Sequence, residues 1–269
     1  MKLLTTFIRS KPMLFWGLIW PTLWIFIGVT MFKPPVGVPR LLYYGSQIAF
    51  LLQIAFSTLS ISGAIDAALD SIKLPYMLRF TKVTSKSYVS ALLLSYFIFS
   101  IIQSLIVVGI SPPVFGIEYG SIGGALPTIF FLALISATLY MELGIIVSYV
   151  LLLLKLPRLT QVASFIPFIV MYVAVMGQVV ATFKGHMLVY IPFNELYTIT
   201  VTSMANVAGS AYVDYTLNAY GISEASLMYM NILLPIWIII LALIAISLVT
   251  TYNRSGLRGK YRTEDIMGG

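Results

Sequence analysis

Six long apolar runs dominate this chain and constrain its fold more than any other feature. A helix needs about 20 apolar residues to cross the roughly 30 Å hydrocarbon core of a membrane. The runs cover residues 13–32, 41–64, 89–110, 122–154, 161–183 and 229–250. Charged residues make up only 9% of the chain, whereas soluble domains carry roughly 25%. The sequence therefore predicts an all-α membrane protein whose six transmembrane helices form a single domain over residues 1–269.

The positive charges lie in the short segments between these runs, and their distribution predicts an orientation. With the N-terminus inside, the inner segments carry thirteen Lys and Arg residues and the outer segments carry three. Because cytoplasmic loops are enriched in Lys and Arg, both termini, including the tail 251–269, are expected in the cytoplasm. We expect a multi-pass protein of the cell (plasma) membrane. The net charge of +7 arises from these segments, so nucleic acid is not expected as a partner.

The first 11 residues have the pattern of a helix lying in the membrane interface. Leu3 and Phe7 are spaced for one helix face, while Lys2 and Arg9 occupy the other side, facing lipid headgroups. The apolar run that follows is too long for a signal peptide and is not followed by a small-residue cleavage site. We therefore expect an uncleaved first span.

A basic segment, residues 73–88, separates the second and third runs. It carries four cations and no acid, namely Lys73, Arg79, Lys82 and Lys86. Each charge placed in hydrocarbon costs on the order of 2.5–3.5 kcal/mol, so the segment must lie at the membrane surface as a cytoplasmic loop. With its apolar side chains it suits docking into a groove on a soluble partner. The alternative is a loop that touches only headgroups.

Catalytic motifs are scarce in this sequence. His186, the single histidine, excludes HExxH zinc sites and Ser-His triads, and there is no cysteine and no P-loop motif for ATP. Asp66 and Asp70, one helical turn apart, are expected to close the second span and to balance Lys73. They can in principle bind Mg²⁺ and a diphosphate. This leaves a membrane-embedded lipid-diphosphate enzyme as an alternative function, and a passive channel or assembly subunit as another.

Several side chains inside the runs are candidates for lining a substrate path. They are the aromatic Trp16, Trp20 and Trp24, which share one helix face, and the polar Gln53, Gln103, Glu142 and Gln178. For the tryptophans the alternative is interfacial anchoring or contact with lipid. An acid within a membrane span is a functional candidate by default. Counting from Lys155 along a continuous helix puts Glu142 about 18 Å deep, whereas a broken helix puts it at an interface or a water-filled cleft.

Other features concern the course of the chain. Polar residues in the second span predict that it faces other helices. The fourth run is about 50 Å long as one helix, so we expect it to tilt, to project beyond the lipid, or to break near Pro127 or Gly144. Ser111 to Gly120 is expected to be a loop because of Pro112 and Pro113. Residues 184–228 form a larger outer segment, in which 194–206 is expected to be a short helix.

The chain resembles a permease of the type-2 ATP-binding-cassette (ABC) exporter superfamily, over its whole length. Three segments are similar to that family: FIRSKPMLFWGLIWPTLWIF at 7–26, LRFTKVTSKSYVSALLL at 78–94, and ELGIIVSYVLLLLKLPRLTQVASFIPF at 142–168. They correspond to its connecting helix and first span, its coupling loop, and its fourth-to-fifth span junction. The sequence departs from the family where Lys82 replaces the usual proline, and where residues 71–74 replace an Arg/Glu-x-Gly-Thr run.

The resemblance implies a dimer, with a second permease copy or a paralogue, and two ABC ATPase subunits beneath it. ATP and Mg²⁺ would be held by those ATPases, and this chain would bind no cofactor and catalyse no reaction. The residues expected to contact the ATPase are Lys73, Leu74, Tyr76, Leu78, Arg79, Lys82 and Lys86. The cargo is expected to be amphipathic.

Overall fold

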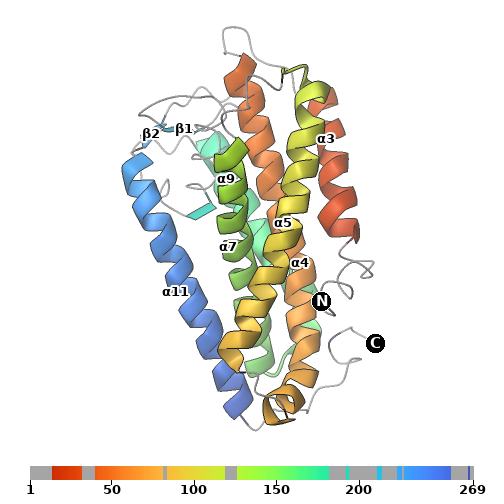
Figure 1. Cartoon of the computed structure of the whole chain (residues 1–269), viewed down its shortest axis with the longest axis vertical. Helices are drawn as coiled ribbons and strands as arrows, with labels where there is room; N and C mark the ends of the chain where they lie inside the picture. The colour runs from red at the N-terminus through yellow and green to blue at the C-terminus, as the bar shows by residue number, and fades with distance from the viewer. Residues whose placement is uncertain are drawn as a thin grey trace.

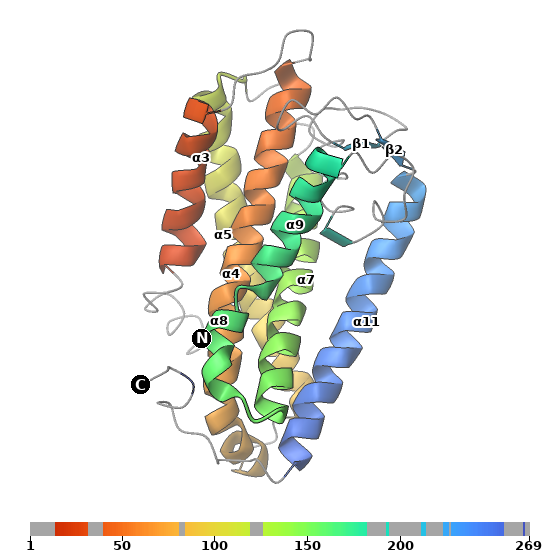
Figure 2. The same cartoon turned by 180° about the vertical axis from the view of Figure 1, so that it is seen from behind.

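A computed structural model describes residues 14–31, 40–80, 84–118, 126–181, 192–193, 211–213, 223–225, 227–255 and 266. Nearly all of these residues are helical, and long helices run up and down an elongated bundle (Figure 1). The helices are η1 (Phe15–Ile19), α3 (Trp20–Met31), α4 (Arg40–Phe80), α5 (Ser85–Phe115), α7 (Leu126–Leu153), η3 (Pro157–Leu159), α8 (Thr160–Ala163), α9 (Ile166–Ala181) and α11 (Leu227–Arg254). On the opposite side of the bundle, α8 and α9 cover α4 and α7 (Figure 2).

Five of the described segments are long and apolar enough to cross a membrane. They are Tyr43–Leu74, Ser85–Phe115, Leu126–Leu153, Pro157–Val175 and Ile232–Arg254. In the predicted first span, η1 is followed directly by α3, and these helices are not among the five segments. The chain is therefore a helical, multi-pass membrane protein. The predicted interfacial helix at 1–11 and the predicted short helix at 194–206 lie outside the described residues.

α4 is the central helix of the bundle. In its most apolar 18-residue window 94% of the residues are buried, compared with 17% in α11. α3, α5, α7 and α9 all pack against it. Serine, alanine and glycine are frequent along α4, and such small residues let neighbouring helices approach closely. The burial confirms the prediction that this span faces other helices.

Two glycines mark the closest helix contacts. A Cβ on Gly63 of α4 would lie 2.5 Å from the Met141 sulfur of α7 and 2.7 Å from the Tyr96 ring of α5. A Cβ on Gly144 of α7 would lie 3.1 Å from the Ser60 carbonyl oxygen of α4. One turn along α7, the Ser148 hydroxyl lies 2.7 Å from the Ala64 carbonyl oxygen. The interface of α4 with α5 and α7 therefore has no room for a methyl group at Gly63.

The segment between the second and third spans differs from the predicted loop. α4 continues through residues 73–80 as helix, and α5 begins at Ser85. Thr84 caps α5 with a capping box, in which the Ser87 N–H donates to Thr84 Oγ1 and the Thr84 N–H donates to Ser87 Oγ. Positive charge keeps this segment out of lipid but does not prevent it from being helical. Asp66 and Asp70 accordingly lie within α4 and do not end it.

The loop predicted from Ser111 is also wrong, because α5 continues to Phe115 with Pro112 and Pro113 inside it. Each proline removes a donor near the end of the helix, where surrounding groups can satisfy the freed carbonyls. Gly116 then ends the helix in the left-handed region at φ 67°. The Ile117 N–H donates to the Pro112 carbonyl at 2.8 Å and the Gly116 N–H to the Pro113 carbonyl at 3.2 Å, which together form a Schellman motif.

The fourth run forms a single helix, α7, which begins beside Pro127 and continues without a break through Gly144. Proline is well tolerated in the first turn, where backbone N–H groups have no intrahelical partner. A tight basic turn at residues 155–158 follows this helix. Lys155 adopts φ 63°, and the Leu156 N–H donates to the Leu151 carbonyl at 2.9 Å. This is a second Schellman motif, with lysine in the position usually taken by glycine.

The fifth span is interrupted. α8 ends at Ala163 and α9 begins at Ile166. Pro167 explains the break, because it cannot donate to the carbonyl four residues earlier and its ring clashes there. Beyond α9, the described part of the outer segment includes strands β1 (Ala211–Val213) and β2 (Ser223–Ala225), which pair antiparallel with Tyr212 opposite Glu224. α11 follows and contains Pro235.

Candidate functional site

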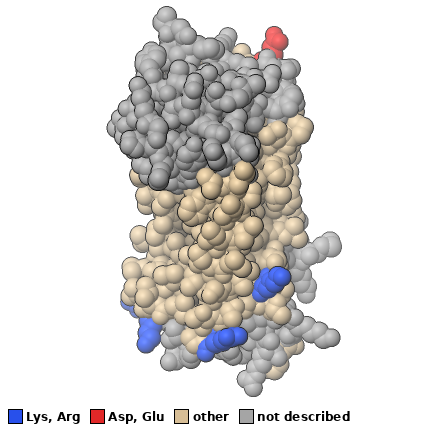
Figure 3. All heavy atoms as spheres, turned by 90° about the vertical axis from the view of Figure 1, so that its left-hand side faces the viewer, with Lys and Arg blue, Asp and Glu red and all other residues tan. Residues whose placement is uncertain are grey.

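One end of the bundle carries the exposed cations. Among residues with described side chains, Lys73, Lys86, Lys155, Arg158 and Arg254 are all exposed. They lie near the C-terminal ends of α4, α7 and α11, at the start of α5, and in η3. In Figure 3 the blue basic side chains lie toward the lower end, an acidic side chain is visible at the opposite end, and a band without charge separates them. This separation is what a membrane-spanning bundle requires.

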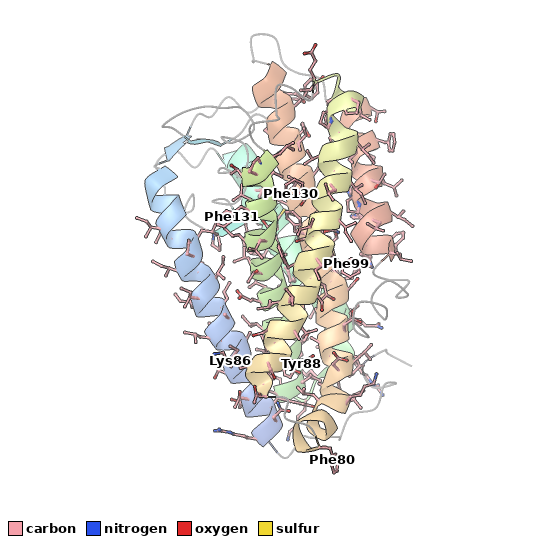
Figure 4. All side chains as sticks on the ribbon, viewed as in Figure 1. Phe80, Lys86, Tyr88, Phe99, Phe130 and Phe131 are labelled. Atoms are coloured by element: carbon pink, nitrogen blue, oxygen red, sulfur yellow. The ribbon has the colours of Figure 1, made fainter. Side chains whose placement is uncertain are left out.

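The tip of the α4–α5 pair extends furthest at this end. Phe80, the last residue of α4, is 75% exposed, and Figure 4 shows it at the bottom of the molecule, below Lys86 and Tyr88. An aromatic ring this exposed, in a segment that also carries lysines, is typical of a contact surface. Lys73 and Lys86 are exposed as a contact role requires.

The other residues predicted to contact the ATPase differ in burial and location. Leu74 is fully buried within the core cluster, so its side chain is not available to a partner. Tyr76, Leu78 and Arg79 lie in the last turns of α4. Lys82 lies outside the described residues. Of the apolar residues in the basic segment, Phe80 is therefore the one with an exposed side chain in the described part.

Two aspartate–tyrosine pairs join α4 to α5 just inside this end. The Tyr96 hydroxyl lies 3.3 Å from Asp66 Oδ2, and the Tyr88 hydroxyl lies 3.4 Å from Asp70 Oδ2. Both tyrosines are buried, at 1% and 6% exposure, whereas the aspartates are half-buried. A buried tyrosine hydroxyl needs a hydrogen-bond partner, and here the carboxylates provide it.

α11 is tied to the same region. The Asn253 side-chain amide lies 3.3 Å from Ser85 Oγ at the start of α5. The ring of Tyr252 packs edge-on against Tyr149 of α7, with 5.5 Å between centroids. Contacts from α4, α5, α7 and α11 therefore meet at the basic end.

Glu142 lies deep in the bundle. Its side chain is fully buried, and neither carboxyl oxygen has a hydrogen-bond partner among the described residues. Because α7 is continuous, its twelve-residue separation from Lys155 corresponds to about 18 Å along the helix. The structure thus favours the deep position over the interfacial one. A carboxyl group without a partner at such depth is costly, which marks Glu142 as the most unusual side chain of the interior.

A second polar contact lies between α4 and α7. The Tyr140 hydroxyl donates to Gln53 Oε1 at 2.6 Å, while Gln53 Nε2 is buried and has no partner in the described part of the chain. The ring of Phe193, from the outer segment, packs on Tyr140 with 5.4 Å between centroids. Gln103 is also buried. Gln178 lies in α9, and its side chain is outside the described set.

The tryptophan series follows η1 and α3. Trp16, Trp20 and Trp24 pack edge-to-face, with centroids 5.5 Å and 6.1 Å apart, and Trp16 also contacts Phe165 at 5.3 Å. Trp20 and Trp24 pack against the hydrophobic core. Their indole N–H groups are buried without an acceptor among the described residues. The series therefore faces the bundle, and not only lipid.

Sequence reasoning missed the tyrosine partners of the two aspartates. Tyr88 and Tyr96 are eight residues apart, close to one face of a helix, and the aspartates are four apart on the helix before it. That arrangement is a signal, but pairing them requires the register of two helices. Among the described residues, no group of three His, Cys, Asp or Glu side chains is arranged to hold a metal ion.

No protein-family model and no curated protein matches this chain.

Proposed function

We propose that this protein is the transmembrane permease subunit of an ABC exporter in the cell membrane. It has six spans with both ends in the cytoplasm, and it forms a dimer with a second copy or a paralogue. Separate ATPase subunits bind ATP and Mg²⁺ and dock on the basic end. The chain supplies the path for an amphipathic cargo and does not hydrolyse ATP itself.

The observation that carries this proposal is the exposed tip of the α4–α5 pair. Lys73 and Lys86 are exposed there, and Phe80 is 75% exposed at the end of a helix that extends beyond its apolar part. The charges exclude the tip from hydrocarbon, so the exposed part of the Phe80 ring is accessible to a soluble protein. Aromatic residues surrounded by polar ones are typical anchors of protein interfaces. A groove with an acidic rim on a soluble ATPase would fit this tip.

The interior supports a transport role. A membrane protein with a purely structural core has no need for a buried carboxyl at Glu142 or a buried Nε2 at Gln53 that lack partners among the described residues. In this proposal, Glu142, Gln53, Gln103, Gln178 and the tryptophan series contribute to the path. Their partners change when the helices rearrange.

Neutralising the tip tests the proposal. A variant with Lys73, Arg79, Lys82 and Lys86 changed to Gln should no longer co-purify with an ATPase from native membranes. Its matched control is the double variant Lys155→Gln and Arg158→Gln, which removes cations from the other turn at the same end. We expect the control to retain the ATPase. Unchanged recovery with the four-residue variant would contradict the proposal.

Two competing functions predict different outcomes. For a lipid-diphosphate enzyme, the purified protein alone would show a Mg²⁺-dependent turnover that Asp66→Asn and Asp70→Asn abolish. For a passive channel, flux through reconstituted protein would not respond to ATP. In our proposal the purified chain has no turnover, and transport requires the partner and ATP.

A further inference from the structure

We infer that the Asp66–Tyr96 and Asp70–Tyr88 pairs are positioning contacts that make the inner ends of α4 and α5 one rigid lever. The inference rests on the proposed function for what moves the lever, but not for the rigidity itself. The four side chains contribute through the helices that they join, and not by touching cargo.

The first step is the geometry of the tip. α4 continues for ten residues beyond Asp70 to Phe80, a projection of about 15 Å at 1.5 Å per residue. A force on Phe80 acts at the end of that arm, whereas Lys73 lies near its base, three residues beyond Asp70. Without contacts between α4 and α5, the arm would bend or rotate against α5. A movement of the tip would then not be passed on to the rest of the bundle.

The second step is the spacing of the two pairs. The aspartates are four residues apart on α4 and the tyrosines eight apart on α5, which corresponds to about 6 Å and 12 Å along the two helices. A single contact would act as a pivot. Two contacts at separated points resist rotation of one helix about the other, so they hold both the distance and the angle between the helices.

The third step is the environment of the pairs. The tyrosine side chains are buried at 1% and 6% exposure, so water does not easily replace their bonds. The tyrosine oxygens lie 3.3 and 3.4 Å from the carboxyl oxygens, so each contact is a long hydrogen bond, and the two together hold the helices. The Tyr96 ring also lies close to Gly63, where an added Cβ would come within 2.7 Å of it.

The fourth step connects the lever to the interior. Met141 is the neighbour of Glu142 in sequence, and its sulfur lies against Gly63, beside Tyr96. Asn253 and Ser85 link the base of α5 to α11. Movement of the α4–α5 pair as one body therefore reaches α7 next to Glu142, and α11, without passing through a loop.

Hydrogen exchange of the full-length protein in lipid nanodiscs tests the rigidity directly. The variants are Tyr88→Phe, Tyr96→Phe and the double variant, each of which removes one hydroxyl and keeps the ring. We expect backbone amides of residues 71–88 to exchange about tenfold faster or more in the double variant, because two hydrogen bonds that join α4 to α5 are lost. Tyr140→Phe is the matched control, since it removes an equally buried hydroxyl from a different contact, and it should leave this region unchanged.

Conservative changes at the acids separate the hydrogen bond from simple packing. Asp66→Asn with Asp70→Asn retains an acceptor for each tyrosine and should keep exchange near the wild-type rate, whereas the double alanine variant should match the double phenylalanine variant. Unchanged exchange in the double phenylalanine and double alanine variants would overturn the lever, whether or not an ATPase binds this end.

A coupled assay then separates this inference from the proposed function. With the ATPase bound, the double phenylalanine variant should keep its partner affinity within about twofold but lose transport per ATP by about tenfold or more. Full transport with this variant would overturn the positioning role. If the wild-type protein binds no ATPase, the proposed function is wrong, but the hydrogen-exchange result still stands.

Discussion

The Thr58 hydroxyl oxygen of α4 lies 2.9 Å from the backbone carbonyl oxygen of Trp16, 42 residues earlier in the chain. Trp16 belongs to the π-helix η1, in which the Trp20 N–H donates to the Phe15 carbonyl five residues back. The next donor in that series would be residue 21, which is proline and has no N–H. The single hydroxyl proton of Thr58 also has the Ile54 and Ala55 carbonyls of its own helix at 2.8 and 3.0 Å. Thr58 is thus placed to supply the missing donor in competition with these two acceptors, and it joins the first span to the central helix.

This contact predicts that the effect of Thr58→Val on the free energy of unfolding depends on the residue at position 21. Thr58→Val keeps the shape of the side chain and removes the donor, so it should lower the free energy of unfolding by about 1 kcal/mol. In a Pro21→Ala background residue 21 has its own N–H, and the same change should cost much less. A double-mutant cycle on protein in nanodiscs measures the coupling. Equal effects of Thr58→Val in both backgrounds would show that the hydroxyl does not replace the proline N–H.

The contact at Gly63 predicts opposite effects for two glycine substitutions. Gly63→Ala places a methyl group against the Met141 sulfur and the Tyr96 ring and should destabilise the protein by about 1–3 kcal/mol. At Gly109 a Cβ meets nothing within 4 Å, so Gly109→Ala should stabilise the helix by up to about 1 kcal/mol. Thermal unfolding of the two variants side by side measures the difference. A neutral Gly63→Ala would show that the helices are not packed this closely.

The buried carboxyl of Glu142 predicts that stability and transport respond in opposite directions. Glu142→Leu removes a polar group without a described partner and should raise the free energy of unfolding by about 1–3 kcal/mol. Transport should fall, because stabilising a functional site commonly costs activity. Glu142→Gln retains the size of the side chain and tests whether the carboxyl itself is needed. If it leaves transport and its pH dependence unchanged, Glu142 has only a structural role.

The turn at Lys155 predicts a stabilising substitution. Lys155 adopts φ 63°, which costs an L-residue about 1–2 kcal/mol and glycine nothing. Lys155→Gly should therefore raise the melting temperature. Lys155→Ala removes the same charge but keeps the Cβ, so it should not. An equal gain in both variants would assign the effect to the charge and not to the backbone.

Hydropathy indicated where most of the helices lie. The distribution of Lys and Arg indicated that the cations of residues 73–88 and of residues 155–158 share one end of the bundle. Because α7 is continuous, counting residues also predicted the position of Glu142 along its helix. Hydropathy reports which residues avoid lipid, but not where a helix ends. For this reason the sequence did not show that α4 continues through the basic residues to Phe80. Nor did it show that α5 retains two prolines, since the groups that satisfy the freed carbonyls belong to the folded state.

The contacts between helices were beyond reach from the sequence. The Asp66–Tyr96 and Asp70–Tyr88 pairs depend on the register between α4 and α5, which no single-helix pattern determines. Likewise, the Thr58–Trp16 contact requires a π-helix at a place where the apolar run is uniform. The candidate residues were therefore identifiable one at a time, whereas their partners required the three-dimensional arrangement.

Photo-crosslinking from Phe80 in native membranes tests directly whether an ATPase docks on the tip of the α4–α5 pair. A photoreactive phenylalanine analogue replaces Phe80, and a second protein carries it at Trp237, on the exposed apolar side of α11. Our account predicts that the crosslinked partner of position 80 is a nucleotide-hydrolysing subunit and that position 237 captures none. A membrane assembly in which no such subunit is captured from position 80 would contradict it.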